Sequence, residues 1–256
     1  MRIASWNINS VRIRQERLLD WLAQNQPDVL CLQELKCTDA EFPTLDISAL
    51  GYTSATYGQR TYNGVAILSR LPLENVERGL QDGVEDPQSR LIAATVGGVR
   101  VVSVYAPNGQ ALGSPAYVYK LDWFARLRRY LEARHAPTDQ VLVAGDFNIA
   151  PEARDVYDPL GWANSTLFSP PEREVLQHLC GFGLVDTFRL HHQEAGRYSW
   201  WDYRQLSFPK GKGLRIDHLL ATRPLAQRCT SAGIDREARK GKQPSDHAPV
   251  WADFDV

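Results

Sequence analysis

The 256-residue chain has little of three features that classify many proteins at once: long apolar runs, paired cysteines and an excess of one charge. No apolar run approaches the roughly 20 residues needed to cross a bilayer, which excludes a membrane-spanning helix and gives no reason to expect a membrane partner. The first residues turn polar at Asn7, too early for the apolar core of a secretory signal. We therefore expect a cytoplasmic protein.

The number and spacing of the cysteines argue against a cysteine-bound zinc site and against a disulfide framework. None of the four (Cys31, Cys37, Cys180 and Cys229) forms a Cys-x-x-Cys pair or lies near a histidine at zinc-finger spacing. A structural zinc ion or a disulfide framework is not expected. Cys31, within the apolar run VLCLQ, is predicted to be a small core residue.

The formal net charge of −1 gives no general attraction to nucleic acid, so DNA binding would have to depend on local charge. Two segments supply it. Residues 204–215 hold four cations and no acid, and residues 236–243 hold four cations against one glutamate. Solvated surface loops remain an alternative interpretation of both segments.

The composition, 43% hydrophobic and 23% charged, is typical of a globular protein with a sizeable core. No linker, low-complexity tract or repeat divides the chain, so residues 1–256 are expected to form a single domain. Asn63-Gly64 predicts a hairpin turn before the apolar stretch 65–69, and Gly97-Gly98 predicts a turn between two strands within 90–107. Other strands are expected at 2–8, 28–34, 140–147, 217–222 and 249–254, and helices at 14–26, 116–134 and 172–179. This pattern favours mixed sheets with helices packed outside them, an α/β sandwich.

Polar residues follow or begin several of these strands, where loops converge and sites form in α/β sheets. Any one of them alone is more often a turn residue or a cap. "GDFN" is more specific, because Gly145 frees the backbone just where Asp146 and Asn148 leave a buried strand. The full set is Asn7, Asn9, Glu34, Tyr105, Asn108, Asp146, Asn148, Asp217, Asp246 and His247.

Carboxylates, amides, a phenol and an imidazole together suit hard-cation chemistry on a phosphate. Magnesium prefers oxygen ligands, and the absence of sulfur from the set argues against zinc. Several carboxylates gathered without a cation would also repel one another. The chain is therefore predicted to hydrolyse a phosphate ester with a divalent metal ion.

The motifs "WNIN", "LQELK", "YNGVAILS", "GDFNIAP", "GLVDTFR", "SWWDYR", "GLRIDHLL" and "PSDHAPVW" resemble the exonuclease III family of DNA-repair nucleases, within the deoxyribonuclease-I-like superfamily. They run in order from Asn7 to His247, over essentially the whole chain. "GDFN" and "SDH" are shared with phosphoinositide phosphatases and sphingomyelinases, whereas "SWWDYR" with "GLRIDHLL" is narrower and indicates the DNA-repair branch. The resemblance implies a four-layer α/β sandwich, with two mixed sheets face to face, helices outside and the site at one edge.

The resemblance also implies roles for single residues. Asp146 would position and deprotonate the attacking water, and Asn148 would hold that water or the developing oxyanion. His247, oriented by Asp217, would contact the scissile phosphate, and Tyr105 would hydrogen-bond it. A Mg²⁺ or Mn²⁺ ion would be bound by Asn7, Glu34, Asp146, Asn148, Asp246 and His247, with Glu34 as the principal carboxylate.

For the substrate, the resemblance implies an apolar pocket for a flipped abasic sugar, lined by Trp200, Leu214 and Ile216. Core packing is the alternative for these side chains. The cations Lys210, Lys212 and Arg215 would hold the DNA backbone. Leu167 or Phe168, in the loop 161–174, would narrow the pocket and favour work at 3′ ends.

The expected function is cleavage 5′ to abasic sites in double-stranded DNA and removal of 3′ nucleotides or 3′-blocking phosphates, by a monomer. A lipid or inositol phosphate phosphodiesterase should carry a cationic or apolar membrane-facing loop, and none is obvious. A binding module without catalysis would have little use for the complete set of carboxylates and His247.

Overall fold

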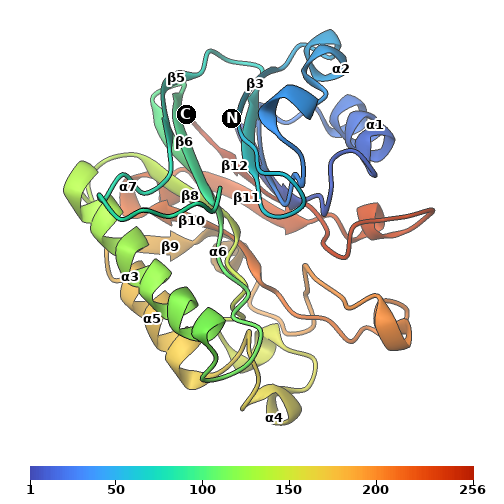
Figure 1. Cartoon of the computed structure of the whole chain (residues 1–256), viewed down its shortest axis with the longest axis vertical. Coiled ribbons are helices and arrows are strands. Elements are labelled where there is room, and N and C mark those ends of the chain that lie inside the picture. Colours follow the sequence, from blue (N-terminus) through green and yellow to red (C-terminus); the bar gives the residue numbers. More distant parts are fainter.

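The structure, a computed structural model, describes residues 1–256 and contains twelve strands, seven α-helices and four short 3₁₀ helices (Figure 1). The strands are β1 (Arg2–Asn7), β2 (Val29–Gln33), β3 (Thr53–Tyr57), β4 (Val65–Ser69), β5 (Glu74–Arg78), β6 (Leu91–Val96), β7 (Val99–Tyr105), β8 (Val141–Asp146), β9 (Leu184–Asp186), β10 (Asp217–Thr222), β11 (Cys229–Ile234) and β12 (Val250–Phe254). The helices are α1 (Gln15–Asn25), α2 (Thr44–Ala49), α3 (Pro115–Arg134), α4 (Pro159–Trp162), α5 (Pro170–Cys180), α6 (Thr187–His191) and α7 (Arg223–Ala226). The 3₁₀ helices are η1 (Asp39–Glu41), η2 (Ala153–Asp155), η3 (Arg204–Leu206) and η4 (Arg236–Arg239).

The strands form two six-stranded sheets with the same pairing pattern. Their orders are β11-β12-β1-β2-β4-β3 and β5-β6-β7-β8-β10-β9. In each sheet the central pair is parallel, β1 with β2 and β7 with β8, and every other pair is antiparallel. Because parallel strands need a crossover connection, a long helix follows the first strand of each pair, α1 after β1 and α3 after β7.

Three apolar clusters hold four layers together. The inner faces of both sheets share a core of 21 buried residues. The outer face of the second sheet packs on α3 and α5, and the outer face of the first sheet packs on α1 and α2. Figure 1 shows α3 and α5 side by side on one flank and α1 and α2 on the other. The predicted four-layer sandwich of two mixed sheets is therefore confirmed, and no helix combines the length and hydropathy of a membrane span.

Most of the helices and strands predicted from the sequence are present, and their ends lie within one or two residues of the predicted ends. The Asn-Gly prediction was only partly right, because β3 and β4 do pair but residues 58–64 connect them in a longer loop. By contrast, Gly97 and Gly98 have φ of 55° and 81° and join β6 to β7 directly. The edge strands β5 and β11, each with a register shift, were missed because their sequences lack a clear apolar alternation.

Gly145 is required by a close approach of two strands. A Cβ atom at this position would lie 1.9 Å from the Val104 carbonyl oxygen on the paired strand β7. Gly145 also uses the backbone freedom expected from the sequence, because its φ is 156°, but it lies within β8 and the close approach is a second reason for glycine here. Its absent side chain lets β8 deliver Asp146 beside Tyr105 at the end of the parallel pair.

A buried ion pair ties the second helical layer to the loop after β8. The side chains of Lys120 in α3 and Glu172 in α5 are both 0% exposed and lie 2.5 Å apart. Lys120 Nζ also donates to the carbonyl oxygens of Asn108 (3.0 Å) and Asn148 (2.7 Å), so all its donors are used. Glu172 in turn accepts from the backbone N–H groups of Leu167 and Ser169.

Replacement of Lys120 by Met should destabilise the fold strongly, because it leaves the Glu172 carboxylate buried without a counter-charge. We expect a loss of about 3–5 kcal/mol in the free energy of unfolding, measured by urea denaturation. The control is Lys240→Met, which breaks the exposed pair of Lys240 with Glu237 and should change stability little. Equal effects of the two substitutions would contradict this account of the buried pair.

Candidate active site

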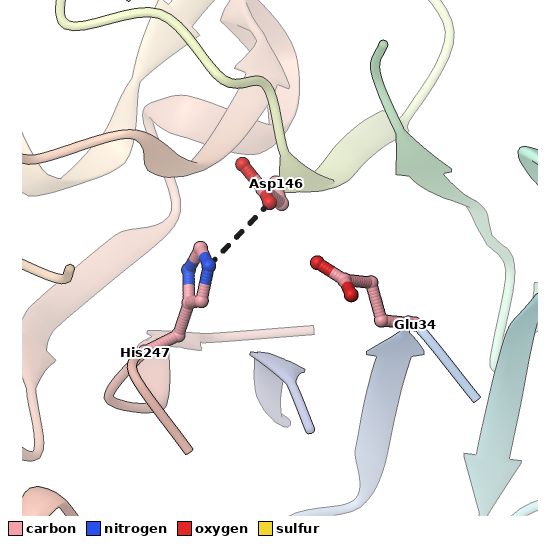
Figure 2. Close-up of side chains that lie close together, drawn as sticks. All are labelled: Glu34, Asp146 and His247. Carbon is pink, nitrogen blue, oxygen red and sulfur yellow. Dashed lines mark ion pairs between the residues drawn. The ribbon is translucent and has the colours of Figure 1, made fainter. Parts of the chain in front are cut away.

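Three ionisable side chains from distant parts of the chain meet at one edge of the two sheets. Glu34 follows β2, Asp146 ends β8, and His247 precedes β12. Each offers one ligand atom, and these atoms all lie within 4.8 Å of one another. Figure 2 shows the three side chains pointing toward a common space, with an ion pair between His247 and Asp146.

Asn7, at the end of β1, links the two carboxylates. Its buried Nδ2 donates to Glu34 Oε1 (2.8 Å) and to Asp146 Oδ2 (2.9 Å). Its Oδ1 accepts from the backbone N–H of Asn9, which fixes the amide orientation. One side chain from the first sheet thereby sets the distance between an acid of that sheet and an acid of the other.

The loop that follows β8 also holds the Asp146 side chain in place. The backbone N–H of Asn148 donates to Asp146 Oδ1 at 2.8 Å, and Asn148 Nδ2 donates to the Ala106 carbonyl oxygen. Burial raises the pKa of Asp146 to about 7, partly offset by the cation on His247. A carboxylate with such a pKa can accept a proton near neutral pH.

His247 lies between two aspartates. Its Nδ1 is 2.9 Å from Asp217 Oδ2, and its Nε2 is 3.7 Å from Asp146 Oδ2. Burial lowers the pKa of His247, but Asp217 and Asp146 outweigh burial and raise it to about 10. Ser199 Oγ donates to Asp217 Oδ2 at 2.6 Å and so orients that carboxylate. The ring is therefore a fixed cation whose Nε2 side faces the site.

Tyr105, the last residue of β7, completes this side of the site. Burial raises the pKa of its hydroxyl well above the ordinary value, and the nearby carboxylates of Glu34 and Asp146 raise it further. The phenol is therefore neutral near pH 7 and available as a hydrogen-bond donor.

Asp246 lies at the outer side of the same edge, between polar partners. Asn9 Nδ2 donates to one of its oxygens (2.9 Å) and Trp200 Nε1 to the other (3.0 Å). Lys36 Nζ lies 2.6 Å from Asn9 Oδ1 and 2.8 Å from Glu34 Oε2, and so joins Asp246 to the central acids through Asn9. Burial raises the pKa of Asp246, but the His247 cation and the two hydrogen bonds outweigh burial, and the pKa lies below its usual value.

Several residues of the site have a left-handed backbone that favours glycine. Asn9, Glu34, Lys36 and Asn148 have φ between 47° and 53°. This conformation costs energy for non-glycine residues and persists only where the surrounding structure imposes it. Here it turns each side chain into the site directly after a strand.

The charge balance of the site fits a divalent cation. Four carboxylates (Glu34, Asp146, Asp217 and Asp246) face two cations, Lys36 and His247. All the ligand atoms other than the His247 nitrogen are oxygens, which suits a hard metal ion. Burial is the main cause of the raised pKa of Asp146, and the nearby Asp217 carboxylate adds to it.

The expected apolar pocket is filled by side chains of this chain. Leu214 and Ile216 pack with Leu167 and Phe168, and none of these four is more than 5% exposed. Trp200 is half-buried at the edge of the cluster, and its ring meets Trp162 edge-to-face. The expectation of an open pocket lined by Trp200, Leu214 and Ile216 is thus not met, because the loop 161–174 closes it.

The expected backbone-holding role of Arg215 is wrong. Its side chain is 1% exposed and pairs with Asp155 and Asp186, each at 2.7 Å. It also contacts His218 Nδ1, so it joins β10 to the loop after β8 rather than facing solvent. Lys210 and Lys212, in contrast, are exposed on the loop before β10.

Sequence reasoning missed residues whose role is to hold others. Ser199 and Lys36 are part of "SWW" and "LQELK", so their motifs were noticed but their contacts were not. Nothing in the sequence indicated that Lys120 is buried, because a lysine on an amphipathic helix is ordinarily exposed.

Comparisons with known proteins agree on one family. The family model described as "Endonuclease/Exonuclease/phosphatase family" matches residues 4–247. Exodeoxyribonuclease III from Haemophilus influenzae is 36% identical, with 99% of this chain and 100% of that protein covered.

Solved structures of related proteins cover this chain completely. The 3′ phosphatase NExo from Neisseria, bound to a product DNA hairpin, is 44% identical with a TM-score of 0.96. An AP endonuclease from Archaeoglobus fulgidus is 38% identical with a TM-score of 0.97, and in both cases 100% of each chain is covered. The chain therefore belongs to the endonuclease/exonuclease/phosphatase family, in its exodeoxyribonuclease III group of metal-dependent DNA-repair phosphodiesterases.

Proposed function

We propose that this protein hydrolyses phosphate esters at the 3′ ends of double-stranded DNA, and so removes 3′-phosphates and 3′-terminal nucleotides, with Mg²⁺ or Mn²⁺ as cofactor. The observation that carries this proposal is the closed apolar cluster beside the catalytic groups, in which Leu167 and Phe168 occupy the space expected for a flipped sugar. A terminal phosphate needs no such pocket. The 44% identity to a 3′ phosphatase supports the same preference.

In the proposed reaction, a water molecule attacks phosphorus in line with the bond to the 3′ oxygen. That bond breaks, the 3′ oxygen takes a proton from a second water molecule to become a hydroxyl, and the phosphate leaves the sugar. Asp146 accepts the proton of the water, as its raised pKa allows. Asn148 fixes the orientation of Asp146 through the 2.8 Å bond from its backbone N–H. Preorganisation of this kind removes much of the entropic cost of the reaction.

His247 and Tyr105 would stabilise the charge that develops on the phosphate oxygens. His247 donates from Nε2, because Asp217 occupies Nδ1 and keeps the ring cationic. A protonated ring has no free lone pair, so we assign His247 to the phosphate and not to the metal ion. Tyr105 contributes a neutral hydroxyl donor.

Glu34, Asp146 and Asp246 would hold the metal ion, with Asn7 setting their spacing. When bound, the ion supplies positive charge that offsets the phosphate and the leaving oxygen. Because one chain supplies all of these residues, we propose that residues 1–256 act as a single domain and as a monomer.

Cleavage 5′ to an internal abasic site is the second candidate function. The 38% identity to an AP endonuclease favours it, and Trp200, which is half-buried and bonded to Asp246, would contact the extruded sugar. It requires the loop 161–174 to move away from Leu214 and Ile216, which costs buried apolar contacts.

Metal removal provides the first test. EDTA should abolish release of inorganic phosphate from a duplex with a recessed 3′-phosphate, and Mg²⁺ or Mn²⁺ should restore it. Mg²⁺ should also raise the unfolding temperature of the wild type but not of Glu34→Gln, because a ligand bound only by the folded state stabilises it. Glu237→Gln, an exposed change, should keep the shift. Full phosphate release in excess EDTA would contradict the proposed chemistry.

Replacement of His247 by Asn removes the cationic donor while keeping a polar side chain. We expect kcat for 3′-phosphate release to fall about a thousandfold or more, while the Kd for the same DNA, measured by anisotropy without metal, changes little. His178→Asn, at an exposed histidine of α5, is the control and should behave as wild type. Near-normal turnover by His247→Asn would rule out its assigned role.

Leu167→Gly should open the closed cluster. Leu167 has a φ of 79°, which glycine adopts without strain, so the loop can keep its backbone while the pocket empties. We expect the ratio of abasic-site incision to 3′-phosphate release to rise about tenfold or more. Leu160→Gly, at a leucine 91% exposed in the neighbouring short helix α4, should leave the ratio unchanged. A wild type that cuts internal abasic sites as fast as 3′-phosphates would refute the substrate preference.

A further inference from the structure

A cavity of about 470 Å³ lies on the outer face of the second sheet, lined by residues of α5, β9, α6, β10 and the loop after β8. Its volume is within the range, roughly 300–1,000 Å³, of cavities that hold small ligands. His218, the residue after Asp217, lines it, and successive residues of a strand face opposite sides of a sheet. The cavity is therefore separated from the catalytic groups by the sheet itself.

Arg173, in α5, is the cation of this cavity that lacks a counter-charge. Of the arginines that are not exposed, it is the only one whose side chain makes neither a hydrogen bond nor an ion pair within the chain. Its Cζ lies 4.7 Å from the centre of the Phe168 ring, and its buried Nε has no acceptor. A cation–π contact uses none of the N–H donors, so Arg173 keeps them for an acceptor from outside the chain.

The other charged residues that line the cavity are paired. Arg189, Asp186 and Glu152 each contact an opposite charge of this chain, although Arg189 is left with a buried Nε that has no acceptor. His218 is held between Arg215 and the Ile149 carbonyl oxygen, and burial lowers its pKa, so its ring is neutral. The lining groups and their partners are four cations and three acids, which leaves one net positive charge: Arg154, Arg173, Arg189 and Arg215 against Glu152, Asp155 and Asp186.

The rest of the wall is apolar and favours an organic anion over a free inorganic one. Leu176, Leu184 and Leu220 line the cavity beside Pro151. Inorganic phosphate would pair with Arg173 and leave this apolar surface in water. A nucleoside monophosphate would pair with Arg173 and also cover the apolar wall with its base or sugar, which is favourable.

We propose that this cavity binds a nucleoside 5′-monophosphate, with its phosphate on Arg173 and its nucleoside against the apolar wall. The inference rests on the proposed function and extends it, because removal of 3′-terminal nucleotides releases nucleoside 5′-monophosphates. The cavity is then a product-binding site outside the catalytic centre. It lies beside the loop that closes the apolar cluster, since Phe168, which contacts Arg173, belongs to that cluster.

The test is isothermal titration calorimetry of the whole protein in EDTA, with deoxyadenosine 5′-monophosphate, inorganic phosphate and deoxyadenosine as probes. The nucleotide should bind about tenfold more tightly than inorganic phosphate, because it also buries apolar surface. Deoxyadenosine, which lacks the anion, should show no measurable binding. Arg173→Gln should weaken nucleotide binding about tenfold or more, and Arg173→Lys, which keeps the charge, should recover part of the loss.

Two controls separate this cavity from other sites. Arg197→Gln, at an arginine whose side chain is 60% exposed, should bind the nucleotide as the wild type does. His247→Asn should do so too, because His247 lies at the catalytic edge. The nucleotide should raise the unfolding temperature of the wild type and of both control variants but not that of Arg173→Gln, and the same scans show that each variant folds.

Three results would overturn the proposal: no nucleotide binding at millimolar concentration, equal affinity for inorganic phosphate, or binding that His247→Asn abolishes and Arg173→Gln retains. Failure of the proposed function would be distinct. The wild type would then release neither phosphate nor nucleotides from DNA, whatever its affinity for the free nucleotide.

Discussion

Everything at the site depends on excess negative charge being gathered where water cannot fully screen it. Asp146 and Asp217 are almost completely buried, and Glu34 and Asp246 are partly buried beside them. Buried carboxylates are tolerated only when cations and hydrogen-bond donors compensate them. His247, Lys36, Asn7 and Ser199 supply part of that compensation, and a bound metal ion would supply the remainder. The same arrangement raises the pKa of Asp146 and keeps the His247 imidazole charged.

The double sheet explains how such a site can be assembled from distant segments. Each sheet contains a single parallel pair, and the ends of these pairs carry Asn7, Glu34, Tyr105 and Asp146. Since the sheets lie face to face, both pairs end at the same edge. The left-handed residues that follow the strands then turn side chains inward, at a local cost that the rigid sandwich sustains.

Much of this could be predicted from the sequence, and the exceptions have physical causes. Strand alternation and helix spacing gave mixed sheets with helices outside, and the family resemblance gave the four layers. The polar residues at the strand ends predicted that Glu34, Asp146 and His247 lie together, because strand ends bring loops to one edge. The same reasoning misplaced Arg215, since sequence shows a cation but not the two aspartates, 60 and 29 positions away, that bury it. It also could not decide whether Leu214 and Ile216 face a ligand or other side chains, because the deciding residue, Leu167, belongs to a loop without periodicity.

Catalysis and substrate selection are not independent in this structure, because one buried ion pair holds both. Glu172 Oε1 accepts from Lys120 Nζ and from the backbone N–H of Leu167, while Lys120 donates to the Asn148 carbonyl oxygen. Leu167, which closes the apolar cluster, and Asn148, whose N–H bonds Asp146, are therefore linked by three contacts through two charged, fully buried side chains. A loop that moved to admit a flipped sugar would strain that connection. Admission of such a sugar here would require the loop to open without displacing Asn148, and glycine at position 167 would meet this requirement, because it adopts the φ of 79° there without strain.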